Sequence, residues 1–136
     1  MPTFSEKSKK ELDTLDPRLK TVLEDAIQYI DFVIVEGHRE QEAQDKAFAT
    51  GRSKLPWPKG NHNKKPSTAV DVAPYPIDWS DKTDSIRRFC YLAGFIVSSG
   101  RRLGIKLRWG ADWNKNDDLR DEGNFRDWPH FEIVED

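Results

Sequence analysis

Apolar residues recur along the chain at two different spacings, which predict where helices and strands lie. Over residues 16–30 and 84–103 the apolar positions are three or four residues apart, as on one face of a helix. Asp16 can cap the first of these helices, and Gly104 lies just beyond the second as a stop signal. A shorter and more polar helix is predicted over residues 40–50. These segments supply the helical part of the expected fold.

The remaining apolar segments are short and rich in β-branched or aromatic residues, which is typical of strands. They cover residues 32–35, 69–73, 105–109 and 130–134. Helices interleaved with short strands indicate an α+β domain, in which the helices pack against one small sheet. A chain of 136 residues fits one domain, so we expect residues 1–136 to form a single folded unit.

Composition and charge narrow the possible functions. Five tryptophans and seven phenylalanines supply the burial that a disordered chain lacks. The net charge of −2 includes no basic excess, which argues against a nucleic acid as the main partner. Cys90 is the single cysteine and excludes an internal disulfide. The N-terminal residues lack the apolar core of a secretory signal, and no run of about 18 apolar residues predicts a membrane span.

Candidate chemistry gathers around two histidines and an aspartate. His62 lies in a basic loop before a predicted strand, Asp71 lies within that strand, and His130 begins another strand. A catalytic zinc ion takes three protein ligands and leaves one position open for water, and imidazole and carboxylate groups both suit it. Neighbouring strands lie about 5 Å apart, so the three side chains could converge on one metal ion. His38 could substitute as a ligand, but a structural role is favoured because no carboxylate-bearing strand follows it.

Each of these residues also has a simpler interpretation. Asp71 interrupts an otherwise apolar strand, and a buried carboxylate needs a partner, which is either a metal ion or a basic side chain. Asp127 and His130 are three residues apart and would face opposite sides of a regular strand. Pro129 prevents a regular ladder there, so a turn can bring both side chains to one site. Otherwise Asp127 is a surface aspartate beside a partly buried histidine.

At these residues the sequence resembles the phage endolysins that act as L-alanyl-D-glutamate peptidases, which belong with the D-alanyl-D-alanine carboxypeptidases and the hedgehog-like zinc fold. The shared pattern is a histidine, an aspartate in a following apolar strand, and an acidic residue three positions before a C-terminal histidine. The matching segments are, in chain order, Gly37-His38-Arg39 with Gln44, Gly51-Arg52-Ser53-Lys54, Pro66-Ser67 before Ala69-Val70-Asp71, and Trp109-Gly110-Ala111-Asp112-Trp113. The sequence departs from the pattern at Gly60, where the family often has serine.

The resemblance implies a small, mainly antiparallel sheet and a zinc-dependent endopeptidase that cuts the L-alanyl-D-glutamate bond of peptidoglycan stem peptides. It implies zinc ligation by His62, Asp71 and His130. Asp127 would take a proton from water and deliver it to the leaving amine. The enzyme is expected to be a monomer that is made in the host cytoplasm without a signal peptide and reaches the cell wall after holin-type release.

Substrate contacts are also implied by the resemblance. Arg39 would stabilise the developing oxyanion or grip a substrate carboxylate. Gln44, Trp113 and Trp128 are further candidate substrate-binding residues. Gln44 could instead brace Arg39, and the tryptophans could equally belong to the core.

Other functions remain open at this point. A D-alanyl-D-alanine carboxypeptidase would share the metal site and differ in how it holds its substrate. A non-catalytic, zinc-stabilised wall-binding module would usually close the fourth metal position, and Asp127 argues against it. The basic loop over residues 54–65 also suggests a metal nuclease. Acidic residues between positions 112 and 122 could bind a second hard cation such as calcium, although a solvated loop is favoured.

Overall fold

The computed structural model describes residues 2–121 and 126–135, and its elements follow the predicted order with an additional helix at the N-terminus. The α-helices are α1 (Glu6–Leu12), α2 (Pro17–Ala26), α3 (Gln41–Ala49) and α4 (Thr83–Leu103). Two short 3-10 helices are η1 (Asn61–Asn63) and η2 (Leu119–Asp121). The strands are β1 (Phe32–Glu36), β2 (Ala69–Pro74), β3 (Leu107–Trp109) and β4 (His130–Ile133).

Helix ends differ from the sequence prediction for local reasons. The charged helix α1 has too few apolar positions to show a period, and Ser5 caps it by accepting a hydrogen bond from the Ser8 amide at 3.1 Å. Helix α2 ends at Ala26, earlier than predicted, because the next residues form tighter turns, with the Tyr29 amide donating to the Ala26 carbonyl. At the end of α4, Gly104 adopts a φ of 72°, as its role as a stop signal requires.

The strands form a single sheet in the order β1-β2-β4-β3, with every neighbouring pair antiparallel. This confirms the predicted α+β fold with one small antiparallel sheet. Strand β3 begins at Leu107 and not at Ile105, because the Ile105 amide donates to the carbonyl of Gly100 and closes the end of α4.

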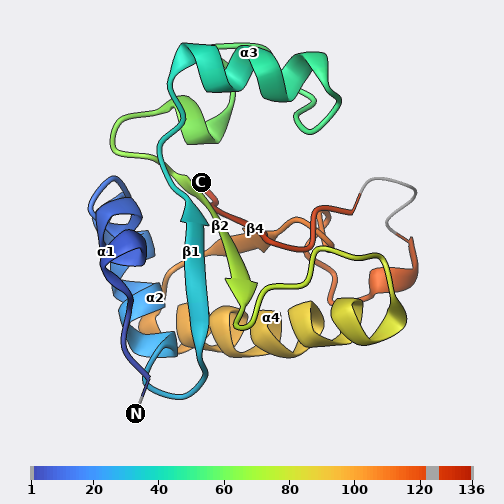
Figure 1. Cartoon of the computed structure of the whole chain (residues 1–136). Coiled ribbons are helices and arrows are strands. Elements are labelled where there is room, and N and C mark those ends of the chain that lie inside the picture. The colour runs from blue at the N-terminus through green and yellow to red at the C-terminus, as the bar shows by residue number, and fades with distance from the viewer. Residues whose placement is uncertain (1, 122–125, 136) are drawn as a thin grey trace.

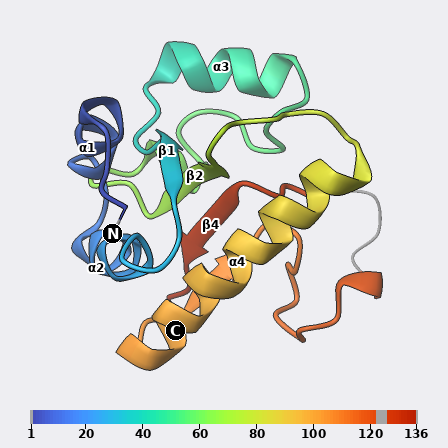
Figure 2. The same cartoon turned by 60° about the horizontal axis from the view of Figure 1, so that its bottom comes forward.

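Successive side chains along each strand point alternately toward the hydrophobic core and toward the opposite face of the sheet. Val70 and Val72 of β2 and Phe131 and Ile133 of β4 are buried in the hydrophobic core. Helix α4 packs against α2, β2 and β3, and α1 packs against β1. Figures 1 and 2 show α4 running along one side of the sheet and α3 standing on the other side. Within the described residues, no helix is both long and apolar enough to cross a membrane.

Candidate metal centre

Asp71, His130 and Glu132 project from the face of the sheet that is turned away from the core. Along β2 and β4 they alternate with Val70, Val72, Phe131 and Ile133, which face the core. Asp71 of β2 and His130 of β4 are paired directly across the two strands. The sheet register therefore brings together two residues that are far apart in the sequence, and it fulfils the expected convergence of these strands.

His62 approaches the same point from η1, in the loop that follows α3. Its Nδ1 atom donates to the carbonyl of Gly37 at 2.7 Å, since a carbonyl oxygen can only accept. The other ring nitrogen, Nε2, lies 3.3 Å from Oδ1 of Asp71. That nitrogen is buried and makes no hydrogen bond in the described chain, so its lone pair is available to a metal ion.

His130 has the complementary arrangement. Its Nε2 atom donates to Oε1 of Glu132 at 2.7 Å, and its Nδ1 atom lies 3.3 Å from the same Oδ1 of Asp71. Glu132 is buried, and its second oxygen accepts from Nη1 of Arg108 at 3.2 Å. Each imidazole therefore has one nitrogen held by an acceptor while its other nitrogen faces Asp71.

The donor atoms of His62, Asp71 and His130 lie within 4.8 Å of one another. Two imidazole nitrogens and a carboxylate oxygen are ligands that a divalent transition metal accepts, and the unpartnered Nε2 of His62 is consistent with such an ion. The held outer nitrogens match the usual support of metal-ligating histidines. The cluster can bind a metal ion. His38 is not part of it, because its ring contacts the Lys64 carbonyl and Glu40.

Neighbouring charges and hydrogen bonds shift the pKa values of Asp71 and His130. Burial alone would raise the pKa of Asp71, but the charge of His62 and the hydrogen bond from His130 hold that pKa well below its usual range. Burial alone would lower the pKa of His130, but its hydrogen bonds to Asp71 and Glu132 raise the pKa to about 10. In the metal-free protein, His130 is therefore a cation between two carboxylates.

Asp127 reaches the cluster through a tight turn. The His130 amide donates to the Asp127 carbonyl at 3.1 Å, so the turn at Trp128-Pro129 forms as the sequence suggests. Gly110 holds this turn by accepting from the Asp127 amide and donating to the His130 carbonyl, both at 2.8 Å. Burial, followed by the charge of Asp71, raises the pKa of Asp127 to about 6. A carboxyl group with a pKa near neutrality can exchange protons at working pH.

Arg39 and Gln44 form a buried network beside the cluster. Arg39 donates through Nε and Nη2 to Oε1 of Glu36, and through Nη1 to Oε1 of Gln44 at 2.9 Å. Its Nη2 atom lies 3.7 Å from Oδ2 of Asp71. Gln44 is fully buried, and it also accepts from Asn63 and donates to Ser53 and Leu55. Its hydrogen-bonding capacity is fully used within the protein, which makes it a brace for Arg39.

The two candidate tryptophans lie in different surroundings. Trp113 packs against the ring of His130, with centroids 5.6 Å apart, and lines the cleft over the cluster. Trp128 packs against the core, where its carbonyl accepts from Nε1 of Trp109 at 2.8 Å. It is not among the described residues that line the cleft.

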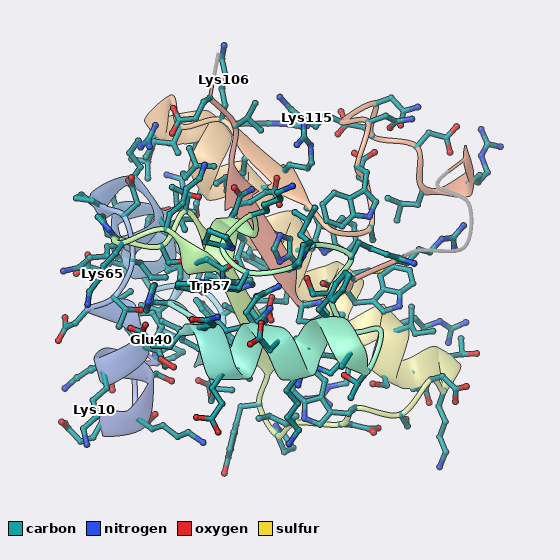
Figure 3. The ribbon with its side chains drawn as sticks, turned by 90° about the horizontal axis from the view of Figure 1, so that it is seen from above. Lys10, Glu40, Trp57, Lys65, Lys106 and Lys115 are labelled. Atoms are coloured by element: carbon teal, nitrogen blue, oxygen red, sulfur yellow. The ribbon has the colours of Figure 1, made fainter. Side chains whose placement is uncertain are left out.

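The cluster lies in a cleft of about 850 Å³. A second cavity, of about 730 Å³, runs along the C-terminal half of α4 and includes Lys106 and Lys115. Figure 3 shows these two lysines at the edge of the molecule opposite α3, whereas Glu40 and Trp57 lie close to α3. Because the two cavities have no lining residue in common, the second one lies apart from the metal centre.

In the acidic loop that follows β3, carboxylates accept hydrogen bonds from other residues of the same loop. Asp112 accepts from the amides of Asn116 and Asp117, and Asp118 pairs with Arg120. Glu122, at the end of the stretch considered for a second cation, lies outside the described residues. The hydrogen bonds of the described part fit the interpretation of a solvated loop.

Sequence reasoning missed Glu132, Glu36 and Asn63 as partners of the site. Glu132 left a signal, because residues two apart on a strand face the same side, and Glu132 follows His130 at that distance. Glu36 lies only three residues before Arg39, whereas Asn63 left no signal, since its role depends on where the chain folds back.

Two histidines and an aspartate lie around one point, with the carboxyl group of Asp127 beside them, and this donor set can bind a metal ion. The family described as phage L-alanyl-D-glutamate peptidase matches residues 2–134, and the chain belongs to this family. The L-alanyl-D-glutamate peptidase of Escherichia phage T5 is 37% identical over 140 residues, which cover 96% of this chain and 97% of that protein. The crystal structure of the Serratia marcescens L-Ala D-Glu endopeptidase ChiX has the same fold, with a TM-score of 0.71 at 24% identity, and the match covers 97% of this chain and 90% of that one.

These comparisons confirm the resemblance to the phage endolysins and the prediction of a peptidoglycan endopeptidase. The chain is an enzyme of the peptidase class. The family description does not fit the nuclease or the non-catalytic wall-binding module considered from the sequence.

Proposed function

We propose that the protein hydrolyses the L-alanyl-D-glutamate bond of peptidoglycan stem peptides with a zinc ion held by Nε2 of His62, a carboxylate oxygen of Asp71 and Nδ1 of His130. One observation carries this proposal: both imidazoles turn a nitrogen toward the same Asp71 oxygen, while their other nitrogens are held by Gly37 and Glu132. Zinc suits this donor set because it accepts nitrogen and oxygen ligands and keeps a position open in catalytic sites.

When bound, zinc supplies Lewis acidity, which polarises a carbonyl group and brings the pKa of a coordinated water near 7. Asp127 is the base in this proposal. Its carboxylate takes the proton of the attacking water and returns it to the nitrogen of the leaving amine, so that the proton is conserved through the reaction. Burial, the larger cause of its raised pKa in the metal-free protein, favours the protonated form that donates to the leaving amine.

Arg39 is proposed to stabilise negative charge on the substrate carbonyl. Three of its contacts are committed to Glu36 and Gln44, which fix the guanidinium in one orientation. A guanidinium has five N–H groups, so donors on Nη1 and Nη2 are left for a substrate oxygen. Arg39 lines the cleft, and its fixed orientation means that little reorganisation is needed during the reaction.

The aromatic residues are proposed to have separate roles. Trp113 contacts the substrate, because it lines the cleft beside His130. Trp128 supports the turn that carries Asp127 by packing on Trp109. Gln44 acts on the substrate only through Arg39. We further propose that the enzyme acts as a monomer on the wall after release through a holin-type pore.

Mass spectrometry of digested peptidoglycan tests the proposed bond. The expected products are peptides with a new amino-terminal D-glutamyl residue, and their formation should stop when a chelator removes the metal and resume when zinc is restored. Release of terminal D-alanine alone would replace the proposal with a D-alanyl-D-alanine carboxypeptidase. Undiminished cleavage in the zinc-free protein would overturn the role of the metal.

A further inference from the structure

The charges at the mouth of the cleft differ from those at its floor. The acidic lining residues Asp71, Asp127 and Glu132 belong to the metal centre and are buried or partly buried. The exposed charged lining residues are all basic: Arg52, Lys54 and Arg126. A positive rim on a protein of net charge −2 is a local feature that average composition does not explain.

Arg52 and Arg126 also differ from the other arginines. Every other arginine donates at least one hydrogen bond to a carboxylate or a carbonyl; these are Arg18, Arg39, Arg87, Arg88, Arg101, Arg102, Arg108 and Arg120. Across residues 2–121 and 126–135, Arg52 and Arg126 have no hydrogen bond or ion pair. Both line the metal cleft, and they come from two separate loops, after α3 and before β4.

The proposed substrate carries a matching charge. A glutamyl residue within a peptide has two carboxyl groups, of which only one can continue the chain. The residue that follows the cut bond therefore carries a free carboxylate, unless that group is amidated. Guanidinium groups bind carboxylates through paired, charge-assisted hydrogen bonds.

We propose that Arg52 and Arg126 bind free carboxylates of the stem peptide and make the enzyme selective for a D-glutamyl residue whose carboxylate is not amidated. This inference rests on the proposed function, and it adds a substrate selectivity that the metal centre alone does not supply. Arg39 is assigned a different role, because the donors that Glu36 and Gln44 leave free are proposed to bind the substrate carbonyl.

Two synthetic stem peptides that differ only in a free or amidated D-glutamyl carboxylate test this inference. We expect kcat/KM to be about fivefold higher for the free acid, mainly through KM, a size typical of one charge-assisted contact near the surface. Arg52→Gln and Arg126→Gln should reduce this ratio toward one, whereas Arg52→Lys should retain part of it. Arg87→Gln is the matched control, since Arg87 is an exposed residue of α4 that pairs with Asp84 outside the cleft.

Binding to the zinc-loaded Asp127→Asn variant, measured by calorimetry with the same two peptides, separates this inference from the proposed function. A preference for the free acid in Kd that Arg52→Gln or Arg126→Gln removes would support the arginine site even if neither peptide were cut at the L-alanyl-D-glutamate bond. Equal binding of both peptides, or a loss of affinity by the same factor for both, would overturn it.

Discussion

Glu132 accepts a hydrogen bond from Nε2 of His130 at 2.7 Å, and this contact decides which nitrogen of the histidine faces the metal centre. Replacing Glu132 with alanine should weaken zinc binding about 10- to 100-fold, as is typical for the loss of a carboxylate that supports a metal-ligating histidine. Competition with a chelator measures the affinity. Glu132→Gln should lose less, because its amide oxygen can still accept.

The control for this variant is Glu135→Ala, which removes an exposed carboxylate that pairs with Arg18. Its zinc affinity should equal that of the unmodified protein. An unchanged affinity in Glu132→Ala would show that the orientation of His130 does not depend on Glu132.

Asp127→Asn should reduce kcat about 10²- to 10⁴-fold, because the amide cannot take the proton of the attacking water. Zinc content, measured by mass spectrometry of the native protein, should stay the same, since Asp127 is not one of the proposed ligands. Asp13→Asn, at an exposed aspartate near Lys20, should leave both quantities unchanged. Retained activity in Asp127→Asn would exclude Asp127 as the base.

Zinc binding should release protons. His130 has a pKa of about 10 in the metal-free protein, where burial opposes the shift and the hydrogen bonds to Asp71 and Glu132 outweigh it. A ligating imidazole must be neutral, so binding near pH 8 should release about one proton. Calorimetry in buffers of different ionisation enthalpy measures this number, and heats that are independent of the buffer would contradict it.

The same pKa predicts how the stability of the metal-free protein depends on pH. The folded-state pKa of His130 lies above the ordinary value of 6.5, so protonated His130 stabilises the folded protein. This contribution to the free energy of unfolding is complete below pH 6.5 and is lost as the pH rises through about 10. Urea unfolding at several pH values in the presence of a chelator should therefore show decreasing stability across this window. His130→Gln should remove this part of the pH dependence.

Gly110→Ala should disrupt the turn that carries Asp127. A methyl group at this position would lie 2.2 Å from the Asp127 carbonyl oxygen, which leaves no room without moving the turn. We expect kcat to fall together with a loss of about 1–3 kcal/mol in unfolding free energy, as for other overpacked sites. Activity and urea unfolding at the unmodified level would mean that the turn can move without consequence.

Gly94→Ala is the matched control, because apart from its neighbours and the backbone of α4 itself no atom lies within 4 Å of the added methyl group. This variant should gain about 0.5–1 kcal/mol from helix propensity. Its activity should not change.

Gln44→Leu should destabilise the fold by about 2–3 kcal/mol, because buried donors of Arg39 and Asn63 lose their shared acceptor. If Gln44 served only to bind substrate, the variant would raise KM and leave the urea midpoint unchanged. Gln28→Leu, on the exposed side of the turn after α2, should stay within about 0.5 kcal/mol of the unmodified protein.

The sequence by itself predicted the strands, most of the helices and the three residues that the structure brings together as a possible metal-binding cluster. Alternation in Ala69-Val70-Asp71-Val72-Ala73 predicts which side chains share a face, because strand geometry is local. The segment from Asp127 to His130 likewise indicates a turn, because proline restricts its own backbone and that of the residue before it. The missed helix α1 shows the limit, since its charged sequence carries little period.

Only the tertiary structure decided how these residues are supported and used. The register between β2 and β4 pairs Asp71 with His130, and no local rule fixes which strands become neighbours. The contacts of Asn63 with Gln44, Gly110 with the Asp127 turn, and Gly37 with His62 depend on folding of distant segments. Local preferences act over a few residues, whereas hydrogen bonds and charge coupling at this site depend on distances that exist only after the chain has packed.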